Sequence, residues 1–266
     1  MPSPPAKPVV LCILDGWGVG ETVQGNAPQL AATPNMDRLL AQHPSATLTT
    51  FGPDVGLPRG QMGNSEVGHT NIGAGRVVAM DLGQIDLAIE QGSFSTHPPM
   101  VEFIAALKDS GGAAHLMGLV SKGGVHGHLS HMIAAVHALV DAGVPVVIHA
   151  LTDGRDVAPQ AALDDLAELT RALPETVRIA TLSGRYYALD RDNRWARVAL
   201  AHDAIVQAKG PAADSAQAAV QAAYAAGTTD EFIKPCVIGD YGGAQAGSGM
   251  HAHVSLIDGD GRNIFD

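Results

Sequence analysis

The middle of the chain repeats one pattern three times: a short apolar run followed by a segment with helical periodicity. Apolar runs without polar alternation are typical of strands buried on both faces, and a helix after each strand connects neighbouring parallel strands. The pattern therefore predicts an α/β fold in which helices flank a mainly parallel sheet. The predicted strands cover residues 113–120, 144–151 and 177–182, and the helices after them cover 129–141, 160–173 and 194–208.

Other segments extend this pattern towards both ends. Residues 9–14 form a continuous apolar run and residues 46–50 a shorter one, so both are predicted strands. A threonine followed by proline is a typical helix start, which predicts a helix from Thr33-Pro34 to about Gln42. Further helices are predicted over 80–90, 99–108 and 212–226, and the second of these is closed by Gly111 and Gly112.

Composition, net charge and cysteine content indicate the class of protein, its partners and its cellular compartment. The 266 residues are 46% hydrophobic, enough to build two modest domains or one large one. A net charge of −11 argues against nucleic acid or an anionic membrane as the main partner. Cys12 and Cys236 both lie in apolar runs that predict buried strands. With so few cysteines, no basic apolar leader and no run of roughly 20 apolar residues, the sequence predicts a cytoplasmic protein.

A glycine-rich stretch over residues 61–78 surrounds a serine. Asn64 and Ser65 have the pattern of a helix start, whose free N–H groups and positive dipole end suit a serine that carries a phosphoryl group or binds a metal. An ordinary capped helix explains the same residues. Asp15 ends the predicted strand over 9–14, at the sheet edge where α/β proteins bind ligands, but an Asp-Gly turn with no further role is about as common.

Cationic residues gather in the three loops that follow the repeated strands. Because the carboxyl ends of parallel strands lie at one edge, the loops over 121–128, 152–156 and 183–194 should converge on one crevice. Arginine binds carboxylate and phosphate bidentately, so these loops suit a small substrate with more than one anionic group. A surface ion-pair network with Asp190 and Asp192 is the alternative. The arginines of these loops are Arg155, Arg185, Arg191 and Arg194, and Arg197 follows three positions later.

Three histidines fall in or just after the first of these loops. His126, which follows two glycines closely, is well placed to contact a ligand, whereas His131 is interpreted as a surface residue of the predicted helix. Together with His128 they could be read as a metal cluster. No cysteine joins them, so zinc is not predicted.

Five motifs stand in order along the chain: Ile13-Leu14-Asp15-Gly16-Trp17-Gly18, Gly63-Asn64-Ser65-Glu66-Val67-Gly68-His69, Gly123-Gly124-Val125-His126, Asp153-Gly154-Arg155-Asp156, and Gly184-Arg185-Tyr186-Tyr187 through Asp190-Arg191-Asp192. Together they resemble the motifs of cofactor-independent (2,3-bisphosphoglycerate-independent) phosphoglycerate mutases. The resemblance extends from about Val9 to Tyr241.

This resemblance implies a metalloenzyme of the alkaline phosphatase superfamily that interconverts 3-phosphoglycerate and 2-phosphoglycerate. Ser65 matches the nucleophile, which takes the phosphoryl group and returns it to the other hydroxyl of the bound glycerate. Asp15 and Ser65 match two ligands of a pair of manganese ions, with Mg²⁺ or another divalent metal as the alternative. The residues that match those holding the substrate's phosphate and carboxylate are His126, Arg155, Asp156, Arg185 and Arg191.

The resemblance also implies a division into domains. Residues 1–79 match the N-terminal piece of the metal-binding, alkaline-phosphatase-like domain, and residues 80–245 match the phosphoglycerate-binding transferase domain. Residues 246–266 form an atypical tail. The expected protein is a monomer that acts on phosphoglycerate, without a nucleic-acid or membrane partner.

Two departures from the family pattern bear on function. Lys122 and Gly127 stand where aspartate and serine are usual. Beyond residue 241 the family continues into further substrate arginines and metal ligands, which the tail does not resemble, so the sequence predicts a C-terminally truncated chain with an incomplete phosphatase domain. The alternative function is a non-catalytic fragment that at most binds phosphoglycerate. Another member of the superfamily, such as a phosphopentomutase, is disfavoured by the arginine-rich loops.

Overall fold

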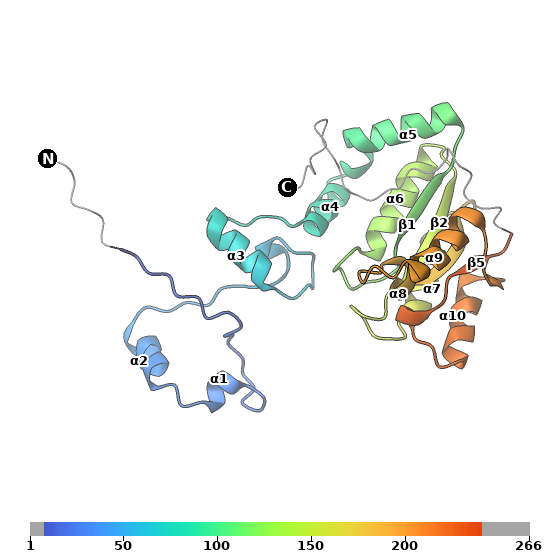
Figure 1. The fold of residues 1–266 in the computed structure, drawn as a ribbon. Coiled ribbons are helices and arrows are strands. Elements are labelled where there is room, and N and C mark those ends of the chain that lie inside the picture. Colours follow the sequence, from blue (N-terminus) through green and yellow to red (C-terminus); the bar gives the residue numbers. More distant parts are fainter. Residues whose placement is uncertain (1–7, 241–266) are drawn as a thin grey trace.

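The computed structural model describes residues 8–240, and one mixed sheet lies at the centre of the part that follows residue 98 (Figure 1). The strands within this range are β1 (Ala114–Leu119), β2 (Val146–Thr152), β3 (Arg178–Gly184), β4 (Ala212–Ala213) and β5 (Cys236–Ile238). Their order in the sheet is β1-β2-β3-β5-β4. The first three strands are parallel, β5 is antiparallel to β3, and β4 is parallel to β5. The prediction of an α/β fold with a mainly parallel sheet is confirmed.

Helices cover both faces of this sheet. Those on one face, which contribute to the main core, are α6 (Leu129–Asp141), α7 (Ala162–Ala172) and α10 (Ala216–Ala225). On the other face α9 (Trp195–Gln207) packs through Ala204 against Val147 and Val237. These four helices lie where the sequence predicts them. A single extra turn, α8 (Arg185–Ala188), precedes α9.

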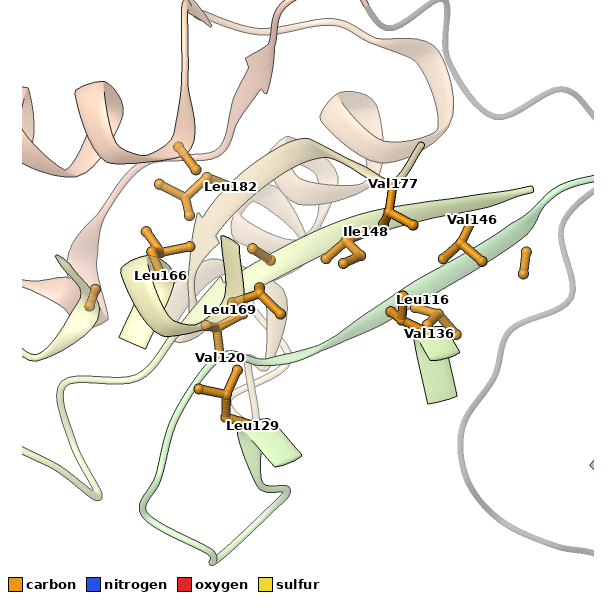
Figure 2. Close-up of a cluster of buried hydrophobic side chains, with 14 of the residues drawn as sticks. Leu116, Val120, Leu129, Val136, Val146, Ile148, Leu166, Leu169, Val177 and Leu182 are labelled. Atoms are coloured by element: carbon orange, nitrogen blue, oxygen red, sulfur yellow. The ribbon is translucent and has the colours of Figure 1, made fainter. Parts of the chain in front are cut away.

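The main core is built from aliphatic side chains of the strands and of α6, α7 and α10 (Figure 2). Every residue of β2 is buried, as expected for a central strand that is covered on both faces. Side chains of Ile148, Leu166 and Leu182 have no exposed surface. The apolar run over 144–151 thus corresponds to a strand buried on both sides.

The segment before the sheet is helical, as predicted. It consists of α4 (Asp81–Glu90), the 3-10 turn η2 (Phe94–Thr96) and α5 (Pro98–Ser110). Gly111 ends α5 with φ of 66°, a left-handed conformation that glycine adopts without strain. Leu107 of α5 reaches the main core.

The first part of the described chain contains helices but no strand. Its helices are α1 (Ala27–Leu30), α2 (Pro34–Gln42), the 3-10 turn η1 (Gly52–Val55) and α3 (Ser65–Ala74). The predicted strands over 9–14 and 46–50 are therefore wrong. Val9 is 95% exposed, and Cys12 is exposed rather than buried, whereas Cys236 is buried in β5 as predicted. An apolar run forms a strand only where a neighbouring strand satisfies its backbone groups, and no described strand lies beside this one.

Three further features complete the description of the fold. No helix among residues 8–240 combines the length and the apolar composition needed to cross a membrane. The predicted tail over 246–266 lies outside the described residues. A last 3-10 turn, η3 (Asp230–Phe232), lies between α10 and β5.

Candidate functional site

The serine of the glycine-rich stretch lies at the start of α3, as predicted. Asn64 caps this helix, because its Oδ1 accepts a hydrogen bond from the Val67 amide at 3.0 Å. The Ser65 hydroxyl donates to Asp15 Oδ2 at 2.6 Å, across fifty positions of sequence. Gly63 permits the tight approach of this loop, since a Cβ there would lie 1.7 Å from the Thr50 carbonyl oxygen. The structure thus brings Ser65 and Asp15 together.

His69 is a neighbour of Ser65 that the sequence reasoning missed. Its Nδ1 lies 2.8 Å from the Ser65 carbonyl oxygen and 3.2 Å from the Ser65 hydroxyl oxygen. A ring nitrogen that donates to the carbonyl leaves the hydroxyl free to donate to Asp15. The spacing of four residues on a predicted helix is the signal that could have found this contact.

The donor atoms around Ser65 do not complete a manganese site. The carboxylate of Asp15 and the hydroxyl of Ser65 offer oxygen ligands, which suit Mn²⁺ or Mg²⁺. Among residues 8–240, however, no group of three or more His, Cys, Asp or Glu side chains is arranged to hold a metal. Two oxygen atoms do not fill an octahedral site, so the described residues do not fit the predicted pair of manganese ions.

A second cluster lies where the three parallel strands end. Ser121, after β1, donates its hydroxyl to Asp153 Oδ2 at 2.7 Å, which joins the first loop to the second. Arg185, after β3, donates through Nη1 to Asp153 Oδ1 at 2.6 Å and to Asp156 Oδ2 at 2.5 Å. The three loops therefore converge at the carboxyl edge of the sheet, as predicted.

Asp153 is the most deeply buried charged residue of this cluster, with 3% of its side chain exposed. Burial raises the pKa of Asp153, but hydrogen bonds from Ser121, from the amides of Asp156 and Arg155 and from the Arg185 guanidinium outweigh it and lower the pKa below its usual range. Asp153 is therefore ionised at neutral pH. The sequence reasoning did not name Ser121 or Asp153 as site residues, although Ser121 directly follows one predicted strand and Asp153 lies two positions after another.

Arg185 is held by carboxylates rather than presented to solvent. Its side chain is 9% exposed, and its hydrogen bonds to Asp156 and Asp153 raise its pKa against the opposing effect of burial. A buried guanidinium between two carboxylates is a fixed structural unit. The predicted contact of Arg185 with an anionic ligand stays a prediction.

The other predicted substrate residues are more exposed. The side chain of Arg155 is 55% exposed, with Nη1 3.8 Å from Glu231 Oε1. The side chain of His126 is 47% exposed, with Nε2 3.8 Å from Asp156 Oδ2. Arg191 is exposed and makes no ion pair with another residue of the described range. These side chains follow three adjacent strands and are accessible to a small anion.

Two further arginines of the same region belong to an ion-pair network. Arg197 Nη1 lies 3.0 Å from Asp190 Oδ1 and 3.5 Å from Asp192 Oδ2, and its guanidinium stacks 3.7 Å from the centroid of the Tyr186 ring. Arg194 Nε lies 3.9 Å from Asp192 Oδ2. The surface network that the sequence suggests as an alternative is therefore confirmed for Arg194 and Asp192, whereas the pair of Arg197 with Asp190 is largely buried.

The remaining histidines of the first loop serve the structure. His128 caps α6, because its Nδ1 accepts a hydrogen bond from the Ser130 amide at 3.2 Å. His131 Nε2 lies 2.7 Å from Asp86 Oδ1, which links α6 to α4, and its side chain is only 12% exposed. The interpretation of His131 as a surface residue is wrong, since an α4 carboxylate covers it.

The serine stretch contacts the first strand-end loop. Gln61 donates through Nε2 to the Gly124 carbonyl oxygen at 2.8 Å. In the same loop Lys122, which departs from the family pattern, lies 2.6 Å from Glu168 Oε2 and 3.7 Å from Asp165 Oδ1 of α7. The unusual lysine thus pairs locally with α7, and Gln61 joins the segment of Ser65 to the loop of His126.

Comparisons with known proteins agree with these motifs. Residues 85–256 match the family model described as the BPG-independent PGAM N-terminus. Curated 2,3-bisphosphoglycerate-independent phosphoglycerate mutases from Dinoroseobacter shibae and Paracoccus denitrificans are 68% identical over 244 residues and 66% identical over 245 residues. Each match covers 92% of this chain and 48% of the relative.

A solved structure extends the comparison. The crystal structure of Leishmania mexicana phosphoglycerate mutase at low cobalt concentration matches with a TM-score of 0.64 and 28% sequence identity, over 89% of this chain and 42% of that one. The chain spans about half the length of the curated relatives it matches. On the family match and these relatives, the chain belongs to the family of 2,3-bisphosphoglycerate-independent phosphoglycerate mutases.

Proposed function

We propose that this chain takes part in the interconversion of 3-phosphoglycerate and 2-phosphoglycerate, with Ser65 as the residue that accepts the phosphoryl group. The observation that carries the proposal is the cluster at the carboxyl edge of the sheet. There a fixed Arg185 unit joins the loops of two strands, and exposed cationic side chains follow the same edge. Phosphoglycerate has a phosphate and a carboxylate, which are the anions that arginine binds best.

Each residue has a separate role in this proposal. Arg155 and Arg191 bind the two anionic groups, and His126 contributes a further donor. Arg185 and Asp156 shape the site and hold its loops together. Ser65 receives the phosphoryl group at the start of α3, where backbone N–H groups favour negative charge, and Asp15 accepts its hydroxyl proton in a hydrogen bond.

The metal belongs to the proposal only through the family. Manganese, when bound, would neutralise charge on the transferred phosphoryl group. The described residues do not complete a site for it, so substrate binding in this proposal rests on the arginine and histidine side chains. We also infer that residues 1–79 and 80–245 are separate domains and that the protein is cytoplasmic. We further infer that it is a monomer, which size-exclusion chromatography would test.

A second candidate function follows from the incomplete metal site. On this alternative the chain is non-catalytic and at most binds phosphoglycerate through the strand-end loops. Among residues 8–240 no group of three or more His, Cys, Asp or Glu side chains is arranged to hold a metal, which favours this alternative.

Two measurements on the purified chain separate these functions. Isothermal titration calorimetry with 3-phosphoglycerate tests binding, and a coupled assay with added Mn²⁺ tests turnover. Saturable binding with turnover supports the mutase, and saturable binding without turnover supports the alternative. Absence of any binding heat together with absence of turnover contradicts the mutase and also any binding of phosphoglycerate by the strand-end loops.

A further inference from the structure

The turn η3 holds together the two loops that carry the proposed anion site. The Thr152 hydroxyl, at the end of β2, donates to the Asp230 carbonyl oxygen at 2.7 Å. At the end of β3 the Gly184 amide donates to the Ile233 carbonyl oxygen at 2.7 Å. A Cβ at Gly184 would lie 2.3 Å from the Glu231 carbonyl oxygen, and a Cβ at Gly154 would lie 2.8 Å from Asp230 Cβ. Both loops therefore pack directly on the turn.

The side chain of Asp230 reaches from this turn to the first turn of α7. It is 1% exposed, and its Oδ2 accepts hydrogen bonds from the amides of Ala161 at 2.8 Å and Ala162 at 2.9 Å. Its Oδ1 accepts a hydrogen bond from the Tyr224 hydroxyl of α10 at 2.5 Å. Both carboxylate oxygens are thus bonded within the protein, and Asp230 does not need a ligand.

This contact replaces a cap that the local sequence lacks. The residue before α7 is Ala161, which has no side-chain acceptor for the free amides of the first turn. Asp230 supplies that acceptor from 69 positions away, and its negative charge also suits the helix N-terminus. The loop between β2 and α7, which carries Arg155 and Asp156, is consequently fixed at both ends by η3.

The cation of this loop also faces the turn. Arg155 Nη1 lies 3.8 Å from Glu231 Oε1, next to Asp230 in sequence. A change at Asp230 should therefore be transmitted to Arg155 through the loop and through the neighbouring residue.

We propose that Asp230 is a positioning residue for the anion site: it fixes the loop over 153–161, and thereby Arg155 and Asp156, without touching the ligand. The inference rests on the proposed binding of phosphoglycerate by that loop. Holding a binding group in place before the ligand arrives lowers the entropy cost of binding. Loss of the Asp230 side chain should accordingly weaken phosphoglycerate binding even under conditions in which the variant is fully folded.

Substitution of Asp230 tests this role in the full chain. Calorimetry with 3-phosphoglycerate, well below the melting temperature of each variant, should show affinity reduced about tenfold or more in Asp230→Ala. Asp230→Asn should recover most of the loss, because its amide oxygen still accepts the Ala161 and Ala162 amides. Hydrogen exchange should show faster exchange of these two amides in Asp230→Ala only.

A matched control comes from the same helix as Tyr224. Gln217→Ala removes a hydrogen bond of 2.9 Å from α10 to Thr170 of α7, away from the loop, and should leave affinity unchanged. Tyr224→Phe keeps the Asp230 carboxylate but removes its hydrogen bond from the Tyr224 hydroxyl, and it should weaken 3-phosphoglycerate binding about threefold. This variant supplies the test if Asp230→Ala does not fold. Equal affinity of wild type, Asp230→Ala and Tyr224→Phe, or an equal loss in Gln217→Ala, overturns the inference. A wild-type chain that binds no 3-phosphoglycerate overturns the proposed function itself.

Discussion

Replacing Arg185 by methionine should destabilise the fold, because it removes the only guanidinium that contacts Asp153 among the described residues. Methionine keeps much of the aliphatic length of the side chain but leaves the carboxylate of Asp153 buried without its cation. Asp153 is 3% exposed and Arg185 is 9% exposed, so solvent cannot substitute for the lost partner. Asp156 is 18% exposed and is better able to regain water.

The expected loss of stability follows from the deep burial of Asp153 compared with Asp156. Breaking a buried ion pair by removing one partner typically costs about 3–5 kcal/mol. Asp153 keeps hydrogen bonds from the Ser121 hydroxyl and from the amides of Arg155 and Asp156, which partly stabilise its charge. We therefore expect a loss near the lower end, about 3 kcal/mol at pH 7.

Urea denaturation of wild type and variant at several pH values measures this loss. The folded state lowers the pKa of Asp153, so the stability that its ionised form contributes is present above the unfolded pKa of about 4 and disappears as the pH falls through the lower folded value. The difference between wild type and Arg185→Met should therefore shrink below pH 4. Arg194→Met, which breaks an exposed pair whose side chains are each 64% exposed, is the control and should cost less than about 1 kcal/mol. A cost of that small size for Arg185→Met, or a cost that does not change with pH, would show that the buried ion pair does not stabilise the fold.

Three further predictions concern the core and the first part of the chain. Burial and the neighbouring His115 lower the pKa of His149 to about 4, so protonation of His149 should cost the wild type about 3 kcal/mol of stability as the pH drops from 6.5 towards 4; the pH-dependent loss followed by urea denaturation should be smaller by about that amount in His149→Gln. Leu166→Ala, at a fully buried site, should cost about 2–5 kcal/mol in the same assay, and a loss below 1 kcal/mol contradicts the packing described. Hydrogen exchange should be faster in residues 8–50 than in residues 113–205, and equal protection of the two contradicts it.

The fold of the sheet region could be predicted from the sequence because its signals are local. Apolar runs of strand length alternate with helical periodicity, and helix ends carry glycine or capping residues, so α6 begins and ends where the pattern predicts. The run over 9–14 carries the same local signal but forms no strand. A strand depends on a neighbour in space, and a periodicity argument cannot supply that neighbour.

The site was predictable in part for the same reason. Strand order places the loops of Asp153 and Arg185 at one edge, and this follows from the parallel sheet alone. The sequence does not reveal that Arg185 is occupied by two carboxylates, because any of several acids could pair with it. Asp230 was missed altogether, since no spacing rule relates it to a helix start 69 positions away.

We propose above that phosphoglycerate binds at the carboxyl edge of the parallel strands. A titration of the isotope-labelled chain with 3-phosphoglycerate, followed by amide chemical shifts in NMR, tests it most directly. Binding at this edge should give saturable shifts concentrated in residues 121–128, 153–157 and 184–191, and these shifts should disappear in Arg155→Ala. Shifts that do not saturate, or that map to α5 and α10 instead of these loops, would contradict it.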